Sequence, residues 1–457
     1  MSDGHVHSGS STQNATPSGS GAAVLPFDIV HELLDFASII DVVSLCNTCK
    51  ALRAHLKNES IWKRACAPYG LQDLSRFGGR SAYTIYTQLL RPYASLLGIW
   101  ANDWPFYGRM LEFRLSPGDE DEQGGIIGEL WTFSSRSPPD SPTPPIYTRV
   151  LKLSFEDNDL PQSELSENPL DAPEASAVNL VCVADGPHSR HRATLVRLSE
   201  TPLGKFVQYY RRRVNLPDFP PHISPWYDTG RGLPRIPEVP ETTDHHRELI
   251  KLYPAARLPA VFVAPTAVTK PPAISIVCGV PPSQHICRTL HAPPLAFPTL
   301  DDRAPRYYPL RSCILAGIDP ASDRWSVDNL DGIWYGSYGP NGTECIYLAH
   351  DEEHGTVEAT KITGDLHVPR GCVSWIVHLP LDNQMPTLQG YWTSVRSDGV
   401  MPNRLLMGHG TIAGRGFTDM AIVELMAGVV SADQIDIFWA ELHEFRTYKR
   451  YKGRAPT

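Results

Sequence analysis

The sequence predicts an α+β protein, in which a small helical module precedes a larger and mostly antiparallel β domain. Apolar residues recur at roughly helical spacing between residues 25 and 69, which is typical of short amphipathic helices. From about residue 96 onward, runs of β-branched and aromatic residues alternate with glycine-bearing turns, as successive antiparallel strands do. The 42 prolines, several of them clustered, indicate long irregular connections between these strands.

The helical module occupies residues 23–70. Leu25 and Pro26 open its first helix, because proline is tolerated in a first helical turn. Asp41 is expected to cap a second helix, and Ile61 begins a third. A three-helix module of ~40 residues cannot bury all of its apolar side chains by itself. We therefore expect it to dock on a partner.

The order of residues in this module resembles the F-box, with an opening Leu-Pro, paired leucines, a cysteine-bearing helix and a closing Ile-Trp. The resemblance implies that the module binds the small Skp adaptor, which attaches it to a cullin scaffold and a ubiquitin-conjugating enzyme. It also implies a non-catalytic receptor that selects proteins for ubiquitination and proteasomal degradation. The alternative is an ordinary helical cap packed against the downstream domain. The residues expected at the adaptor contact are Leu25, Pro26, Leu33, Leu34, Leu45 and Trp62.

Composition argues against several other classes of function. The chain has 41 basic and 50 acidic residues, and its formal charge of -9 argues against general binding to nucleic acid. No apolar run approaches the ~20 residues that cross a bilayer, and the N-terminus lacks the apolar core of a signal peptide. We therefore expect a soluble protein of the cytoplasm, the nucleus or both, with no membrane or nucleic-acid partner.

The nine cysteines do not form the pattern of a secreted disulfide framework and are expected to be free thiols. Cys46 and Cys49 form a CxxC on an amphipathic helix, where small buried side chains are the simpler interpretation than a zinc or redox site. A second set, of two cysteines and two histidines, offers four zinc ligands. Its spacing fits no common zinc finger, and prolines interrupt it. We therefore expect no metal or cofactor at Cys278, His285, Cys287 and His291.

Changes in composition set the remaining boundaries. Residues 1–22 are mostly small and polar and are expected to be disordered, and residues 71–95 are expected to form a helical linker. Stretches rich in proline, serine and acidic residues are expected to be exposed insertions within the β domain. This domain takes residues 96–457, with insertions near 134–145 and 156–177 and one helix around Pro202 to Arg213.

The C-terminal half contains the clearest strand patterns. Two apolar runs flank a glycine-rich turn in LDGIWYGSYGPNGTECIYLAH, and a third strand follows in TVEATKITGD. Two or three more are expected from GHGTIAGRGFTDMAIVELM and QIDIFWAELHEFRTYKRY. These strands are numerous enough to close into a barrel, which removes the exposed edges of an open sheet.

The succession LLGIW, GIWYGSYGPNG, TKITGD, GTIAGRGF and FWAEL resembles the F-box only protein 31 family. The resemblance implies a β-barrel substrate domain that binds the C-terminal ends of target proteins, including cyclin tails and, in some members, ends that finish in a primary amide. The chain departs from the animal members in its proline-rich middle and in the short stretch between Gly371 and Gly408. These departures leave the substrate open.

The TVEATKITGD strand suggests how a terminal amide could be bound. Alternation places Lys361 and Thr363 on one face, with Asp365 just past the strand's end. Asp365 would accept from the amide NH2, while Lys361 or Thr363 donates to the amide oxygen. The alternative, which the sequence leaves open, is a surface ion pair between Lys361 and Asp365. The aromatic residues Trp334 and Tyr338, with Tyr335 and Trp375, are candidates for the apolar walls around a peptide tail.

No motif favours an enzyme. The glycine-rich GHGTIAGRGF lacks the Lys-Ser/Thr of a phosphate-binding loop, and glycines at a barrel bend explain it better. The chain has no GxSxG elbow and no HExxH. The second hypothesis for function is a β-barrel that binds a small molecule and keeps its F-box only for its own assembly.

Overall fold

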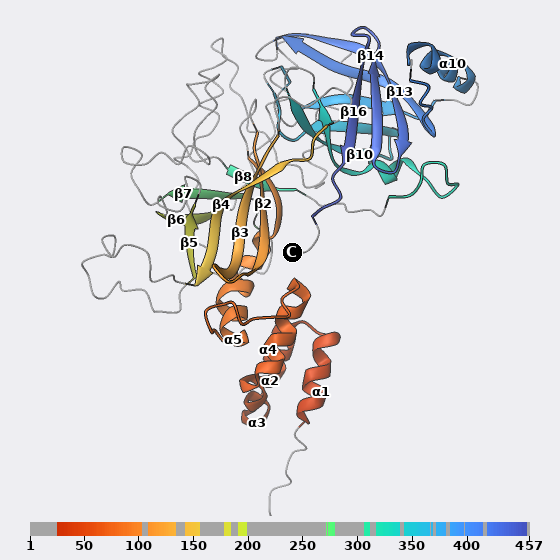
Figure 1. The fold of residues 1–457 in the computed structure, drawn as a ribbon. Helices are drawn as coiled ribbons and strands as arrows, with labels where there is room; N and C mark the ends of the chain where they lie inside the picture. Colours follow the sequence, from red (N-terminus) through yellow and green to blue (C-terminus); the bar gives the residue numbers. More distant parts are fainter. Residues whose placement is uncertain are drawn as a thin grey trace, which may run out of the picture. The chain divides into compact units, whose positions relative to one another are not determined.

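The computed structural model describes most of the N-terminal helical region and most of the strands of the β domain. The described residues are 25–102, 108–133, 142–155, 178–183, 191–198, 271, 273–278, 306–310, 317–338, 342–365, 367–368, 372–380, 384–396, 398–414 and 418–454. The chain divides into two compact units (Figure 1). The first contains the chain up to Gln72 with Ser81–Tyr83, and the second contains Asp73–Arg80 with Thr84–Thr457.

The first unit is helical. Its core consists of small and branched apolar side chains from successive helices, including Val30, Cys46 and Ile61, all with 0% exposure. The helices are α1 (Phe27–Glu32), η1 (Leu33–Asp35), α2 (Ile39–Cys46), α3 (Lys50–Arg53), η2 (Ala54–Lys57), α4 (Glu59–Cys66) and η3 (Ala67–Tyr69). The module is therefore more segmented than the three helices expected from the sequence.

The cap of α2 differs from the predicted one. Ser38, not Asp41, is the N-cap, because its hydroxyl accepts from the Asp41 backbone N–H at 3.2 Å. The Asp41 carboxylate accepts in return from the Ser38 backbone N–H at 3.2 Å, which completes a capping box. The helix consequently begins two residues earlier than the predicted cap, at Ile39.

Short helical turns lead into the strands. They are α5 (Ala82–Thr84), the π-helix η4 (Ile85–Leu90), α6 (Arg91–Tyr93) and η5 (Ala94–Leu96). Helical structure was expected over residues 71–95, and these turns provide it from Ala82 onward.

The second unit contains two closed barrels of eight strands each, where the sequence suggested one. In the first barrel each strand pairs antiparallel with the next, and the last pairs with the first. Its strands are β1 (Gly98–Asn102), β2 (Met110–Gly118), β3 (Gln123–Thr132), β4 (Ile146–Phe155), β5 (Val178–Cys182), β6 (His191–Leu198), β7 (Ala273–Cys278) and β8 (Arg306–Pro309). They run from orange to green in Figure 1.

The second barrel has the same up-and-down order and closes between its first and last strands. Its strands are β9 (Gly332–Ser337), β10 (Thr343–Asp351), β11 (Thr356–Lys361), β12 (Val373–His378), β13 (Arg404–Gly414), β14 (Thr418–Ser431), β15 (Gln434–Trp439) and β16 (Glu444–Arg450). The meander expected from the C-terminal sequence is confirmed. A 3-10 turn, η12 (Val327–Leu330), precedes β9, and a helix that the sequence did not suggest, α10 (Met385–Val395), lies between β12 and β13.

Glycines let the strands of the second barrel pack closely, as expected for GHGTIAGRGF. A Cβ on Gly408 would lie 1.8 Å from the Ile376 carbonyl oxygen on β12. A Cβ on Gly410 would lie 2.2 Å from the Trp439 ring. These two glycines of β13 therefore serve close packing inside a barrel rather than phosphate binding.

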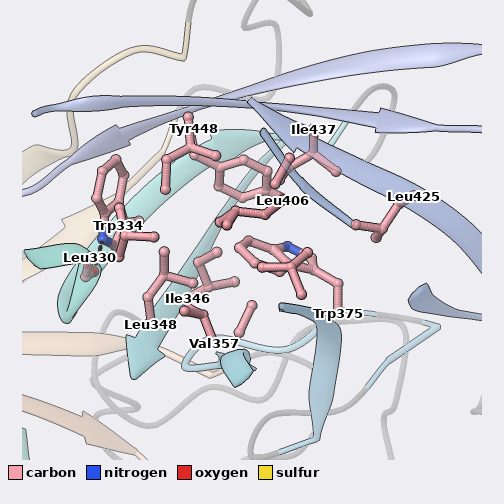
Figure 2. Close-up of a cluster of buried hydrophobic side chains, with 14 of the residues drawn as sticks. Leu330, Trp334, Ile346, Leu348, Val357, Trp375, Leu406, Leu425, Ile437 and Tyr448 are labelled. Carbon is pink, nitrogen blue, oxygen red and sulfur yellow. Dashed lines mark hydrogen bonds between the residues drawn. The ribbon is translucent and has the colours of Figure 1, made fainter. Parts of the chain in front are cut away.

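The core of the second barrel is filled by side chains that alternate along its strands. Trp334, Trp375 and Tyr448 point toward Ile346 and Leu406 from different strands (Figure 2). All five are less than 2% exposed. Period-two alternation thus places one face of every strand inside the barrel.

The two barrels contact each other through an apolar cluster that includes Trp131 from the first and Tyr347 and Tyr451 from the second. A buried carboxylate lies within this contact, since Glu112 accepts from Trp131 Nε1 at 3.1 Å and from the Tyr451 hydroxyl at 3.3 Å. Arg454 lies over the Tyr147 ring at 3.7 Å. The last described residues therefore attach the second barrel to the first.

Several expectations lie outside the described residues. They concern the disordered tail at 1–22, the insertion at 156–177, most of that at 134–145, and the helix at Pro202 to Arg213. His285, Cys287 and His291 also lie outside them, and only Cys278 of that set belongs to a described strand. Six cysteines whose side chains are described are free thiols.

Candidate functional site

The helical unit exposes three apolar side chains in sequence from α1 to α2. Phe36 is 88% exposed, and Ile29 and Ile40 are 43% and 40% exposed. We call Ile29, Phe36 and Ile40 the F-box apolar face. Exposed apolar side chains that form a contiguous patch mark docking surfaces, so these three residues are candidates for one.

The structure divides the predicted adaptor-binding residues into three groups. Pro26 is exposed at the N-cap of α1. Four leucines are partly buried against the unit's own core: Leu25, Leu33, Leu34 and Leu45. Trp62 is 4% exposed, and its indole N–H donates to the Leu56 carbonyl at 2.7 Å. Because Trp62 packs inside the unit, its side chain is a core element in this structure, and the F-box apolar face replaces it as the candidate contact.

The second barrel carries a buried cluster of charged and aromatic residues. We call Tyr338, Glu344, Lys361, Asp365, Arg446 and Tyr448 the charged cluster. Lys361 ends β11 on the same face as the core residues Val357 and Ala359, as the alternation predicted. Its ammonium contacts the carboxylates of Asp365 and Glu344, the latter at 2.6 Å. The side chain of Lys361 is 1% exposed, so the ion pair is buried and not a surface pair.

Asp365 is held in a tight turn after β11. Its Oδ1 accepts from the backbone N–H groups of His367 at 2.7 Å and Val368 at 2.9 Å, and its Oδ2 accepts from Lys361. The side chain keeps 13% exposure. A carboxylate oxygen has two lone pairs, so Oδ2 can accept one more hydrogen bond.

Thr363 does not join the cluster. β11 ends at Lys361, and the strand alternation that placed Thr363 beside it ends there too. The Thr363 hydroxyl accepts instead from the Cys345 backbone N–H at 3.3 Å. Trp334 does not join the cluster either, because it is 0% exposed and its indole N–H donates to the Leu330 carbonyl at 2.8 Å. It is a core residue and not a wall open to a ligand.

The ring of Tyr338 contacts two cations. The Lys361 ammonium is 4.0 Å from the ring centroid, and the Arg446 guanidinium carbon is 4.5 Å from it. Cations over an aromatic face are attracted by the ring's quadrupole. The sequence analysis missed Arg446, whose signal is its alternation with Tyr448 and Arg450 on β16. Glu344 and Tyr448 were missed too, and a buried glutamate has no strong local signature.

The charges in the cluster shift the pKa values of its members. Burial opposes the charged ammonium of Lys361, but the nearby carboxylates of Asp365 and Glu344 outweigh burial and raise its pKa above the ordinary value. Burial also opposes the Asp365 carboxylate, yet Lys361 and the two backbone N–H groups lower its pKa. Burial and the negative charge of Glu344 raise the pKa of Tyr448, which stays a neutral donor to Glu344.

Gly336 makes room for this arrangement. It pairs with Glu344 on one side and with Tyr448 on the other, and a Cβ at Gly336 would lie 2.3 Å from the Tyr448 ring. The missing side chain lets the Tyr448 ring cross β9 and donate to Glu344.

We predict that Gly336→Ala lowers the free energy of unfolding by about 1 to 3 kcal/mol, because the Tyr448 ring must shift. Gly390→Ala is the matched control, since no atom lies within 4 Å of a Cβ there and the residue is inside helix α10. The control should raise stability by up to about 1 kcal/mol. Chemical denaturation measures both, and equal effects would contradict the packing role of Gly336.

Two parts of this chain match domain families of known proteins. A sequence profile of the F-box domain matches residues 24–64, and a profile named Cyclin D1 binding domain matches residues 315–453. The chain carries an F-box domain and resembles F-box only protein 31. The first match covers the helices through α4 almost completely, and the second covers the second barrel with the whole charged cluster.

Three curated relatives of this chain are F-box only 31 proteins. F-box only protein 31-B of Xenopus laevis is 33% identical over 91 residues, which are 19% of this chain and 17% of that protein. The Rattus norvegicus protein is 33% identical over 103 residues, 21% and 20% of the two chains. The Homo sapiens protein is 34% identical over 93 residues, 19% and 17%. Each match thus spans a fifth or less of the relative's length.

No described helix of this F-box protein has both the length and the apolar character of a membrane span. Among the described side chains, no group of three or more His, Cys, Asp or Glu residues is arranged to hold a metal ion.

Proposed function

We propose that the chain is the substrate-recognition subunit of an SCF-type ubiquitin ligase, acting in the cytoplasm, the nucleus or both. The observation that supports this most strongly is the combination of two parts in one chain. An F-box with an exposed apolar face precedes a barrel that matches a Cyclin D1 binding domain. The first part would bind the Skp adaptor and, through it, the cullin scaffold, while the second would bind the protein to be ubiquitinated and degraded.

The F-box apolar face is the proposed adaptor contact. Phe36 has almost its whole side chain in water, although phenylalanine strongly favours burial. An adaptor that covers Phe36, Ile29 and Ile40 would bury this area at no cost to the unit's own core, which uses other residues.

The charged cluster is the proposed site for the C-terminal end of a target, including ends that carry a primary amide. The positive charges of Lys361 and Arg446 are already matched by Glu344 and Asp365, and Arg446 also pairs with the exposed Glu444 at 3.2 Å, so the cluster has no cation to spare. A neutral amide would preserve this balance, whereas a terminal carboxylate would add an uncompensated negative charge to a buried site. The remaining lone pair of Asp365 Oδ2 suits the amide NH2.

The interior of the second barrel disfavours the alternative of a small-molecule carrier. Side chains including Trp334, Trp375 and Trp439 fill it. A carrier of this kind usually keeps an internal cavity of several hundred Å3. The receptor is therefore the function we favour.

A peptide library tests the substrate part of this proposal. The full chain would be co-expressed with the Skp adaptor, purified, and exposed to peptides of matched sequence that end in a carboxylate or a primary amide. We predict selective capture of amide ends, weakened about tenfold in Asp365→Asn, because one acceptor for the NH2 is lost.

Asp436→Asn is the matched control. Asp436 is also buried, but it lies on the outer face of β15, where it accepts from Arg396 at 2.6 Å and Thr447 at 2.8 Å. This variant should lose stability and keep its preference for amide ends. An adaptor complex that captures neither kind of end would refute the tail site, and a carboxylate preference would refute the amide assignment.

A further inference from the structure

Several buried donors of the second barrel have no hydrogen-bond partner, and two of them lie side by side on β15 and β16. Among the described side chains, Trp439 Nε1 and Arg446 Nε are buried without a hydrogen-bond partner. Trp439 is 2% exposed and belongs to the barrel core. The Arg446 guanidinium carbon is 5.4 Å from the Trp439 ring and 4.5 Å from the Tyr338 ring. Arg446 belongs to the charged cluster, and Trp439 therefore lies next to it.

Two other buried indoles in the same unit donate within the chain, whereas Trp375 Nε1, on β12, has no hydrogen-bond partner either. Trp334 donates to Leu330 at 2.8 Å, and Trp392 donates to Val400 at 3.1 Å. An unpaired buried donor costs about 1 to 3 kcal/mol, so such exceptions call for a specific explanation. The strand register places Arg446 opposite Ile437, two residues from Trp439 on the neighbouring strand, so both side chains project from one face of the β15–β16 pair.

We propose that Trp439 Nε1 and Arg446 Nε receive the terminal carbonyl oxygen of the bound tail and act as specificity-determining residues of the receptor. This inference rests on the proposed tail site. The carbonyl oxygen has two lone pairs and can accept from both donors. Asp365 and this donor pair would then bind the two halves of a terminal amide, the NH2 and the C=O.

With this donor pair, a terminal amide would fit the site better than a terminal carboxylate. A terminal carboxylate would satisfy Trp439 and Arg446, but it would present a second negative oxygen to Asp365. A terminal amide satisfies the donors and the acceptor together. The side chains of Arg446 and Asp365 each keep 13% exposure, so the tail would reach the site where these two residues meet solvent.

Matched removal of one indole N–H tests this proposal. Trp439→Phe and Trp334→Phe delete the same atoms from two buried core positions, but only Trp334 uses its N–H within the chain. We expect Trp439→Phe to weaken capture of the tightest amide-ended library peptide by about 5- to 10-fold, while Trp334→Phe leaves its affinity unchanged. Replacing Trp439 with benzothienylalanine, which keeps the ring shape without the N–H, should reproduce the loss even if the phenylalanine variant folds poorly.

A second readout follows the N–H itself. In the full chain labelled with 15N-tryptophan, the Trp439 indole signal, assigned by its absence in Trp439→Phe, should move downfield when the same peptide saturates the protein. The Trp334 signal should not move. If wild type binds the peptide but both Trp439 variants bind equally well and the signal stays in place, the donor proposal is wrong and the tail site stands. If the wild-type protein captures no peptide, the donor proposal and the tail site are both wrong.

Discussion

Replacing Lys361 with methionine is expected to lower the free energy of unfolding by about 3 to 5 kcal/mol, the range seen when one partner of a buried ion pair is removed. The substitution keeps most of the side-chain volume but leaves Glu344 and Asp365 without their shared cation. These carboxylates have side chains only 3% and 13% exposed, so water cannot replace the ammonium fully. Chemical denaturation of the full chain at neutral pH measures the loss.

Lys452→Met is the matched control for this experiment. Lys452 pairs with Asp433 at 2.5 Å, but its side chain is 65% exposed. Exposed pairs contribute ~0 to 1 kcal/mol, so the control should change stability by no more than that. Adding Glu344→Gln to Lys361→Met should restore part of the stability, because one of the two uncompensated charges is removed. Equal losses in Lys361→Met and Lys452→Met would contradict a buried charged cluster.

The penalty of Lys361→Met should also depend on pH. In the wild type the pKa of Asp365 is lowered, so its contribution is present above the unfolded pKa and is lost as the pH falls through the folded one. The pKa of Lys361 is raised, so its contribution is present below the unfolded pKa and is lost as the pH rises through the folded one. The variant lacks the cation that lowers the pKa of Asp365, so protonation of Asp365 removes part of the uncompensated charge. The difference between wild type and variant should therefore shrink as the pH falls below the ordinary pKa of an aspartate, about 4.

Phe36→Asp is expected to weaken binding of the Skp adaptor by about 2 kcal/mol or more, which is roughly 30-fold, without unfolding either unit. Phe36 is 88% exposed, so the chain's own packing loses little. Leu33, one of the residues expected at the adaptor contact, packs against the F-box core, so a substitution there would confuse binding with folding. Titration of the purified adaptor by calorimetry gives the affinity, and circular dichroism checks the fold.

Ile146→Asp controls for the change from an exposed apolar residue to a charge. Ile146 is 61% exposed on β4, far in sequence from the F-box. It should bind the adaptor as the wild type does. An adaptor affinity of Phe36→Asp equal to that of Ile146→Asp would exclude the F-box apolar face from the contact.

The fold was largely predictable because its signals are local. Strand alternation and glycine-rich turns marked the second barrel, where β9, β10 and β11 follow the expected order. The number of barrels was not predictable in this way, because closure depends on pairing between strands far apart in the chain, such as β1 with β8. Helix α10 was missed because its sequence, MPTLQGYWTSV, contains no charged residue and opens near a proline.

The candidate site was predictable only in part. Lys361 and Asp365 lie four residues apart, so one segment revealed both. Glu344 and Arg446 reach the same place from other strands, and strand register decides that meeting. Thr363 was misplaced because alternation was extended past the true end of β11. Trp62 lies in the core of the helical unit, which the sequence could not show, because a buried and a binding tryptophan have the same pattern at a helix start.

The most direct test of the proposed receptor function asks whether one chain binds the adaptor and a protein tail at the same time. The purified chain, the Skp adaptor and a fluorescent amide-ended peptide would be sedimented together in the analytical ultracentrifuge with detection of each component. We predict a complex with one copy of each, and a peptide affinity that the adaptor does not change. Peptide and adaptor that exclude each other, or a chain that binds no adaptor, would contradict the account.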